Sequence, residues 1–158
     1  MMTAHLIRNS YAALKALVTR HVEFGCDRIP YRFDNVPRKK ILNWILAEAS
    51  ARVHVPRPWG LPTILQVEPT NRCNLRCTLC PVTEGLERPA GSMDPDLFKR
   101  LIDEVAGHVF LVLFWEWGEP FVNARIYEMI SYARQKGIKL VYWHNEDCHI
   151  ADSTSQNG

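Results

Sequence analysis

The stretch TILQVEPTNRCNLRCTLCPV, residues 63–82, decides how the rest of this sequence is interpreted. Its first part, from Thr63 to Pro69, is rich in apolar and β-branched residues, which predicts a short strand. Three cysteines follow within eight residues, at Cys73, Cys77 and Cys80. A strand that runs directly into a cysteine-rich loop puts that loop at the carboxyl end of a sheet, where α/β proteins carry their chemistry.

Three thiolates on one loop suit a metal centre, because a thiolate is a soft anionic ligand. A cubane 4Fe–4S cluster has four irons, so three cysteines leave one iron open to an exchangeable ligand. An open position indicates chemistry more than electron storage, as it does for catalytic zinc. The remaining two cysteines, Cys26 and Cys148, are interpreted as free, and the odd total argues against a disulfide framework.

The alternative is a zinc site of three cysteines and one histidine. The candidate fourth ligands are His54, His108 and His144. None of them has the short spacing from a cysteine that structural zinc sites usually have. A zinc-stabilised interaction module nevertheless stays open as a second interpretation.

The residues after the cysteine loop alternate between helix and strand patterns. Residues 93–107 predict a helix in which Asp94 caps, Pro95 takes the first position and Gly107 ends it. Residues 108–115 predict a strand that is apolar throughout, residues 124–137 a helix and residues 138–143 a third strand. The order β-α-β-α-β predicts an α/β fold with a parallel sheet and right-handed crossovers.

The N-terminal part has a different pattern. Residues 4–22 and 38–52 repeat apolar positions at helical spacing, and residues 25–37, with a glycine and two prolines, predict a loop. Three prolines in residues 56–62 cannot continue a helix. We therefore expect a helical N-terminal extension over residues 1–55, a core over 56–143, and an irregular, disordered tail over 144–158.

Composition limits the partners. The net charge of +2 is too small to favour nucleic acid, and the longest apolar run, Val109 to Trp115, is too short to span a bilayer. No secretory signal is evident at the N-terminus. We expect a cytoplasmic protein that binds neither nucleic acid nor membrane.

The segment CNLRCTLC resembles the CxxxCxxC motif of the radical S-adenosylmethionine (radical SAM) superfamily. The resemblance implies that Cys73, Cys77 and Cys80 hold a 4Fe–4S cluster, whose fourth iron is chelated by the amino and carboxylate groups of S-adenosylmethionine. Leu79 stands where the family usually has an aromatic residue near the adenine. It is therefore a candidate cofactor-binding residue.

A second similarity lies after the second predicted strand. The segment WGEP, residues 117–120, resembles the family's GGEP motif, which receives the amino group of the cofactor. Gly118, Glu119 and Pro120 are candidate cofactor-binding residues by this resemblance, whereas Trp117 replaces the first glycine. Glu116 either faces the site or points away from it, and Trp115 and Trp117 are interpreted as packing residues.

The family resemblance also implies an architecture and an activity. The fold would be a partial (β/α) barrel of the radical SAM type. The sequence of residues 58–82 is most similar to members of the family that carry a C-terminal SPASM domain. The activity would be formation of a 5′-deoxyadenosyl radical that abstracts hydrogen from a peptide or another small substrate, with a small redox protein as electron donor. No catalytic residue is assigned.

Only three strands are predicted here, whereas the family core has about six βα units. We therefore expect a truncated or frame-shifted member. A catalytically inactive iron–sulfur-binding fragment is the alternative to an enzyme.

Overall fold

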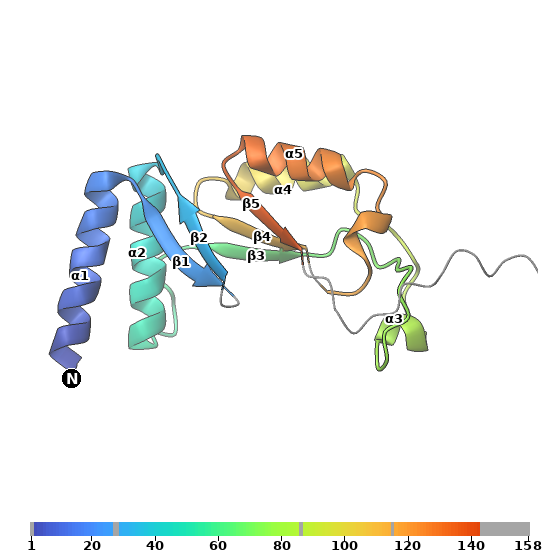
Figure 1. Ribbon diagram of the computed structural model, residues 1–158, viewed down its shortest axis with the longest axis horizontal. Coiled ribbons are helices and arrows are strands. Elements are labelled where there is room, and N and C mark those ends of the chain that lie inside the picture. The colour runs from blue at the N-terminus through green and yellow to red at the C-terminus, as the bar shows by residue number, and fades with distance from the viewer. Residues whose placement is uncertain (1, 27–28, 86, 115, 143–158) are drawn as a thin grey trace, which may run out of the picture. The chain divides into compact units, whose positions relative to one another are not determined.

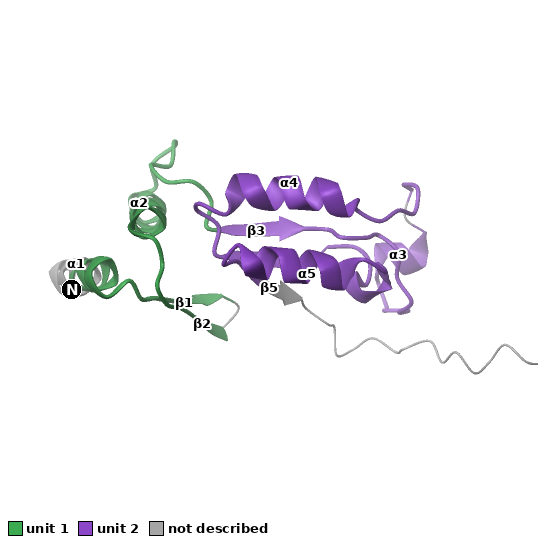
Figure 2. Ribbon diagram, turned by 90° about the horizontal axis from the view of Figure 1, so that it is seen from above, with its two compact units in different colours: residues 1–63 green, residues 64–158 purple. Residues whose placement is uncertain are grey.

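The computed structural model describes residues 2–26, 29–85, 87–114 and 116–142. It divides into two compact units, residues 1–63 and residues 64–158 (Figure 2). The first unit contains two helices and a hairpin: α1 (Met2–Thr19), β1 (Val22–Cys26), β2 (Ile29–Phe33) and α2 (Arg38–Val53). The second contains the parallel sheet and the cysteine loop.

The hairpin corrects one prediction, because residues 25–37 were expected to form a loop. Val22 and Phe33 are paired in the antiparallel register and both are buried, and the Phe24 ring stacks on Phe33 at 5.7 Å between centroids. Pro30 pairs with Gly25. A two-stranded hairpin has an outer edge on each strand, where a proline removes no ladder hydrogen bond. The N-terminal unit is therefore mixed α and β, not helical alone.

The proline-rich segment after α2 folds back on that helix. Asn43 donates from Nδ2 to the Leu61 carbonyl (3.0 Å) and accepts from the Leu61 N–H (2.8 Å). The Trp59 N–H donates to Ser50 Oγ at 2.7 Å. A Cβ on Gly60 would lie 2.5 Å from the Asn43 carbonyl oxygen, so only glycine allows this approach. Side-chain amide and hydroxyl groups thus replace the hydrogen bonds that the prolines cannot make.

The second unit is built on a parallel sheet. Its strands are β3 (Ile64–Val67), β4 (Leu111–Phe114) and β5 (Lys139–Tyr142), paired in the order β3-β4-β5. Two helices connect them, α4 (Pro95–Val105) and α5 (Ile126–Gln135), and two short turns of helix lie nearby, α3 (Pro81–Glu84) and η1 (Pro120–Val122). The predicted β-α-β-α-β order and the parallel pairing are confirmed.

Both connecting helices lie on the same side of this sheet (Figure 1). The core between sheet and helices consists of buried apolar side chains from β3, β4, both helices and the residues just before β4 and β5: Val67, Phe98, Ile102, Val109, Val112, Phe114, Ile126, Met129, Ala133 and Ile138. The Phe98 and Phe114 rings are 5.7 Å apart. Leu111 and Val112 point to opposite faces of β4, and both have 0% exposure.

Helix α4 begins as the sequence predicts. Asp94 is the N-cap and its Oδ1 accepts from the N–H groups of Asp96 (2.6 Å) and Leu97 (3.2 Å), with Pro95 next in the helix. The helix ends at Val105. The capped start fixes the direction in which the chain leaves the cysteine loop.

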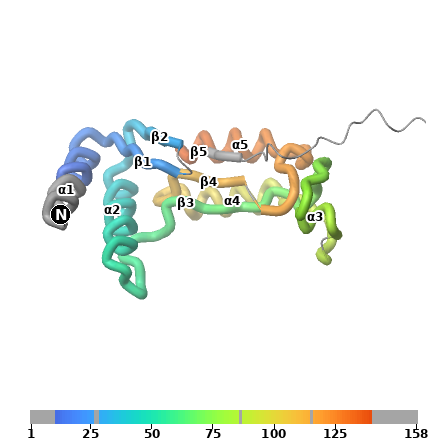
Figure 3. The backbone as a smooth tube through the Cα atoms, turned by 60° about the horizontal axis from the view of Figure 1, so that its bottom comes forward, coloured from blue at the N-terminus to red at the C-terminus, as the bar shows by residue number. Residues whose placement is uncertain are grey.

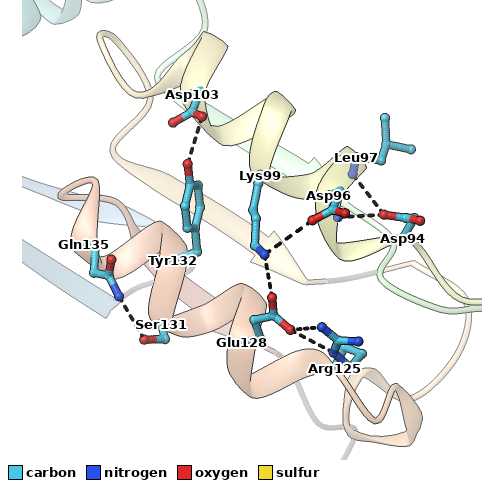
Figure 4. A network of polar contacts seen from close by, with 10 residues as sticks. All are labelled: Asp94, Asp96, Leu97, Lys99, Asp103, Arg125, Glu128, Ser131, Tyr132 and Gln135. Atoms are coloured by element: carbon cyan, nitrogen blue, oxygen red, sulfur yellow. Dashed lines mark hydrogen bonds and ion pairs between the residues drawn. The ribbon is translucent and has the colours of Figure 1, made fainter.

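A polar network joins the outer faces of α4 and α5 (Figure 4). Lys99 Nζ lies 2.5 Å from Glu128 Oε1, and Glu128 also pairs with Arg125. Tyr132 Oη donates to Asp103 Oδ2 at 2.8 Å. Hydrogen bonds from Lys99 and Arg125 lower the pKa of Glu128 below its usual range. These groups are exposed or only half-buried, so the network adds little stability and mainly fixes how the helices pair.

All three strands point toward the end of the unit where α3 lies, as the arrows in Figure 1 show, and Figure 3 shows β3 and β4 on the path that leads to this end. The cysteine loop and the Trp-Gly-Glu-Pro segment follow β3 and β4 at this end. Among the described residues, no helix is long and apolar enough to cross a bilayer.

Candidate functional site

The cysteine loop runs from the end of β3 to α3. Cys73 and Cys80 are half-buried free thiols, and the Cys73 sulfur accepts a hydrogen bond from the Leu75 N–H at 3.4 Å. Cys80 is the residue before α3, and its carbonyl accepts from the Thr83 and Glu84 N–H groups. Cys26, in β1, is free as expected, and Cys148 lies outside the described residues.

Cys77 differs from the other two cysteines of the loop. It is disulfide-bonded. A sulfur in a disulfide cannot bind iron, because the ligand is the thiolate. The assignment of Cys77 as a cluster ligand therefore remains a prediction that requires reduction of this bond.

The base of the loop is held by two buried polar residues, Thr70 and Asn71. Asn71 donates to the Pro89 carbonyl (2.9 Å) and accepts from the Gly91 N–H (2.6 Å). Thr70 Oγ1 donates to the Gly91 carbonyl at 2.7 Å, and Thr70 forms a β-bridge with Ser92. The returning chain is thus fastened to the outgoing chain, so residues 73–88 form a closed loop.

The same base receives the turn after β4. Gly118 has φ +103°, and a Cβ there would lie 2.3 Å from the Thr70 carbonyl oxygen and 2.9 Å from that of Arg72. The Glu119 N–H donates to the Arg72 carbonyl at 2.9 Å. The absence of a side chain at position 118 lets the second segment lie directly against the first.

Glu119 and Pro120 continue this turn and are both buried. Glu119 Oε1 accepts from the Phe121 N–H at 3.3 Å, which caps η1, and Pro120 is the first residue of η1. Asn123 follows, 3% exposed, and donates to the Pro69 carbonyl at 2.9 Å. Hydrogen bonds on both sides of the Gly-Glu-Pro segment therefore hold it against the chain that follows β3.

One cavity of about 510 Å³ is shared by the two predicted segments. It is lined by residues of both the cysteine loop and the turn after β4: Cys73, Leu75, Cys77, Thr78, Leu79, Cys80, Pro81, Phe114, Glu116, Trp117, Gly118, Glu119 and Pro120. Its volume falls in the range of small-molecule sites, roughly 300–1,000 Å³. The structure thus brings together in one cavity all seven residues singled out from the sequence.

Two of the lining residues have backbone conformations that are rare for their type. Leu79 has φ +61° and its side chain is 85% exposed, and Glu116 has φ +148°. The Gln66 side-chain amide donates to the Glu116 carboxylate. Glu116 lines the cavity, whereas Gln66, the partner of its carboxylate, does not. Trp117 also lines the cavity, while Trp115 lies outside the described residues.

The electrostatics of the cavity favour a neutral Cys73 thiol. Burial raises its pKa, the Leu75 N–H opposes this, and the negative charges of Glu119 and Cys80 raise the pKa further. A metal ligand must be a thiolate, so metal binding at Cys73 releases a proton. The described lining residues include two carboxylates and no cationic side chain, which suits a ligand that carries positive charge.

Among the described residues, no three histidine, cysteine or carboxylate side chains lie close enough to hold one metal ion. The three cysteines share a cavity without converging on a point. Their donor type and number still fit three corners of an iron–sulfur cluster, and the cavity has room for a group larger than one ion.

Of the histidines proposed for a zinc site, His108 alone lies in the described part of the second unit, and it does not line this cavity. His108 precedes β4, at the opposite end of the strand from the cavity, which corresponds to about 20 Å along an extended chain. His54 is the residue after α2 in the other unit, and His144 lies outside the described residues. The structure therefore supplies no histidine ligand within the second unit's described part.

Two functional residues of the site were missed in the sequence, Asn123 and Glu68. Glu68 accepts from the Trp117 N–H at 3.3 Å and pairs with Arg88. The Trp117 N–H and the Pro69 carbonyl, to which Asn123 donates, lie 49 and 54 residues away along the chain, so no local pattern reports these contacts. The one available signal was a run of polar residues directly after a strand.

The fold and the site together define an α/β protein with a thiol-lined cavity at the carboxyl ends of parallel strands. The family model described as "Radical SAM superfamily" matches residues 67–155, which is more than half of the chain. The chain belongs to the radical SAM superfamily. Membership implies chemistry that depends on S-adenosylmethionine.

Several curated proteins are similar to part of this chain. A tungsten-containing aldehyde ferredoxin oxidoreductase cofactor-modifying protein of Pyrococcus furiosus is 35% identical over 78 residues, covering 48% of this chain and 22% of that protein. An AdoMet-dependent heme synthase of Nitratidesulfovibrio vulgaris is 32% identical over 97 residues, covering 59% and 26%. A PqqA peptide cyclase of Rhodopseudomonas palustris is 30% identical over 84 residues, covering 53% and 22%.

The matches span about a fifth to a quarter of the length of these relatives. Among solved structures, the crystal structure of BtrN in complex with AdoMet and 2-DOIA has a TM-score of 0.48 and 22% identity, covering 54% of this chain and 36% of that chain.

Proposed function

We propose that the cavity binds a 4Fe–4S cluster through Cys73, Cys77 and Cys80, and S-adenosylmethionine at the iron left open. The observation that carries the proposal is the shared cavity, in which the cysteine loop and the Gly118–Glu119 turn face one another. The acidic lining supports a cationic ligand. When bound, the two groups supply reductive cleavage of the cofactor and a 5′-deoxyadenosyl radical that abstracts hydrogen from a substrate.

In this scheme the residues of the chain hold the cluster, and they orient and cover the cofactor. The three sulfurs bind iron, and Glu119 with the backbone at Gly118 receives the cofactor's ammonium group. Leu79 and Pro120 supply apolar contacts around the cofactor, and Leu79, at 85% exposure, has free surface to cover it. Thr70 and Asn71 keep the loop closed while the cluster is bound.

The substrate and the electron donor belong to the same proposal. The names of three relatives refer to a cofactor, a heme and a peptide, so they do not agree on one substrate class. A peptide is the substrate class that one of these names, PqqA peptide cyclase, supports. A small redox protein supplies the electron, since the described residues of the site contain no redox group besides the cysteines.

Anaerobic reconstitution of the full chain with iron and sulfide, under a thiol reductant that opens the disulfide at Cys77, tests the proposal. We expect visible absorption that dithionite bleaches, and release of 5′-deoxyadenosine after reduction with S-adenosylmethionine present. Absorption without the product would leave an iron–sulfur-binding protein without turnover. Binding of zinc in place of iron would contradict the proposal.

A further inference from the structure

Glu68 lies at the end of β3, between the two segments that form the cavity, but does not itself line it. One of its oxygens, Oε2, accepts two hydrogen bonds. One comes from the Trp117 backbone N–H at 3.3 Å, 49 residues away in the sequence, and the other from the Arg88 guanidinium. The Glu68 side chain is 21% exposed and that of Arg88 is 47% exposed.

The Trp117 N–H is the point at which the turn after β4 is held from one side. The Glu119 N–H, two residues later, donates to the Arg72 carbonyl and holds the turn from the other side. Gly118 lies between these two anchors with φ +103°. The turn therefore has one anchor on each side of its glycine. If the Trp117 anchor is lost, the turn is held only through the Glu119 N–H, and the position of the Glu119 side chain becomes less well defined.

Arg88 orients the carboxylate that provides the first anchor. It belongs to the stretch that returns from the cysteine loop, one residue before Pro89, whose carbonyl Asn71 fixes. A hydrogen bond between two charged groups is stronger than one between neutral groups, so Arg88 fixes the orientation of the Glu68 carboxylate. An ion pair that is only partly exposed is also less screened by salt than a fully exposed pair. The Glu68 carboxylate therefore links the returning chain of the loop to the turn after β4.

We propose that Glu68, braced by Arg88, is a positioning residue that sets the Gly118–Glu119 turn for the ammonium group of the cofactor. This inference rests on the proposed function. Glu68 acts through the Trp117 N–H, so its loss weakens cofactor binding while the three cysteines keep the cluster. The cluster is held by the loop, and the hydrogen bonds by which Thr70 and Asn71 close the loop remain when Glu68 is replaced.

The test uses the full reconstituted chain and three variants: Glu68→Ala, Glu68→Gln and Arg88→Ala. The control is Glu87→Gln, which removes an exposed carboxylate next to Arg88. For each we measure iron content, the dissociation constant for S-adenosylmethionine, and the change in the electron paramagnetic resonance (EPR) spectrum of the reduced cluster when the cofactor is added. Thermal unfolding reports whether each variant is folded.

We expect Glu68→Ala to bind S-adenosylmethionine roughly tenfold more weakly, the change that one charge-assisted hydrogen bond of about 1.4 kcal/mol produces. Glu68→Gln keeps an acceptor for the Trp117 N–H and should be intermediate, as should Arg88→Ala. All three keep the iron content of the wild type and show a smaller EPR change at a fixed cofactor concentration. Glu87→Gln behaves as the wild type.

Two results overturn the inference: an unchanged dissociation constant in Glu68→Ala and Arg88→Ala, or a loss of iron in these variants that matches the loss of cofactor binding. The second would assign Glu68 to the cluster loop. Failure of the wild-type chain to bind cluster or cofactor would instead overturn the proposed function, so the two failures are distinguishable.

Discussion

Gly118 and Gly85 have the same backbone conformation, φ +103°, in different surroundings. A Cβ on Gly85 would meet nothing within 4 Å, whereas a Cβ on Gly118 would lie 2.3 Å from the Thr70 carbonyl oxygen. Alanine substitutions at these two glycines therefore separate two contributions to the loss of stability. One is the strain of a positive φ, and the other is the steric clash that prevents two segments from approaching closely.

We expect Gly118→Ala to destabilise the second unit by about 3 kcal/mol or more, because strain and a backbone clash add. Gly85→Ala should cost only about 1–2 kcal/mol, from strain alone. Denaturant unfolding followed by circular dichroism measures both. Equal losses in the two variants would mean that the turn after β4 does not lie against residues 70–72 as described.

Asn71 offers a second test at this scale. Asn71→Ala removes two partly buried hydrogen bonds that close the cysteine loop, one to the Pro89 carbonyl and one from the Gly91 N–H. We expect a loss of about 2–3 kcal/mol in the free energy of unfolding. Asn74→Ala is the matched control, since Asn74 is exposed in the same loop, and should change it by less than about 0.5 kcal/mol. A tolerated Asn71→Ala would contradict the closed loop.

The cysteines and the Gly118–Glu119 turn, which line one cavity, were singled out from the sequence, whereas Glu68 and Asn123, which hold the turn in place, were not. The cysteines and Gly118–Glu119 have local spacing that resembles a known pattern. The hydrogen bonds of Glu68 and Asn123 join residues 49 and 54 positions apart, so they exist only after the strands pair. The disulfide at Cys77 was likewise not expected from the sequence.

At the scale of elements, local signals were reliable where one residue decides the boundary. Asp94 and Pro95 start α4 as predicted because a side-chain acceptor and a fixed φ act within one turn. The hairpin of β1 and β2 was missed because its prolines and glycine also suit a loop. Its formation depends on the burial of Val22 and Phe33, which a local pattern does not report.

The cap of α4 gives a prediction for this element. Asp94→Ala removes the acceptor for the Asp96 and Leu97 N–H groups, and we expect a loss of about 1 kcal/mol in unfolding free energy. Asp94→Asn keeps an oxygen acceptor and should recover most of that loss. Chemical denaturation measures both. If Asp94→Asn were as destabilising as Asp94→Ala, charge and not capping would explain the role of this residue.

At the scale of the whole molecule, the N-terminal unit carries a buried ionisable group. Lys40, in the first turn of α2, is 5% exposed, and burial lowers its pKa to about 8 from 10.5. Between these two values the unfolded chain binds the proton and the folded chain does not. The stability of this unit therefore rises with pH from about 8 to 10.5, and the charged lysine destabilises the fold below pH 8.

We expect Lys40→Met to remove this slope and to stabilise the unit at neutral pH by about 1–3 kcal/mol. Lys39→Met, at an exposed neighbouring position, should leave the slope in place. The difference in unfolding free energy between variant and wild type, measured from pH 7 to pH 10.5, tests this. A difference that does not change with pH would contradict a lowered pKa at Lys40.

The central claim is that three sulfurs leave one iron open beside the Gly118–Glu119 turn. Electron–nuclear double resonance on the reduced cluster, with S-adenosylmethionine labelled with nitrogen-15 at its amino group, measures this contact directly. The account predicts a nitrogen coupling to the cluster in the wild type that is absent in Cys73→Ala. Binding of S-adenosylmethionine to the cluster-containing protein without any such coupling would contradict the account.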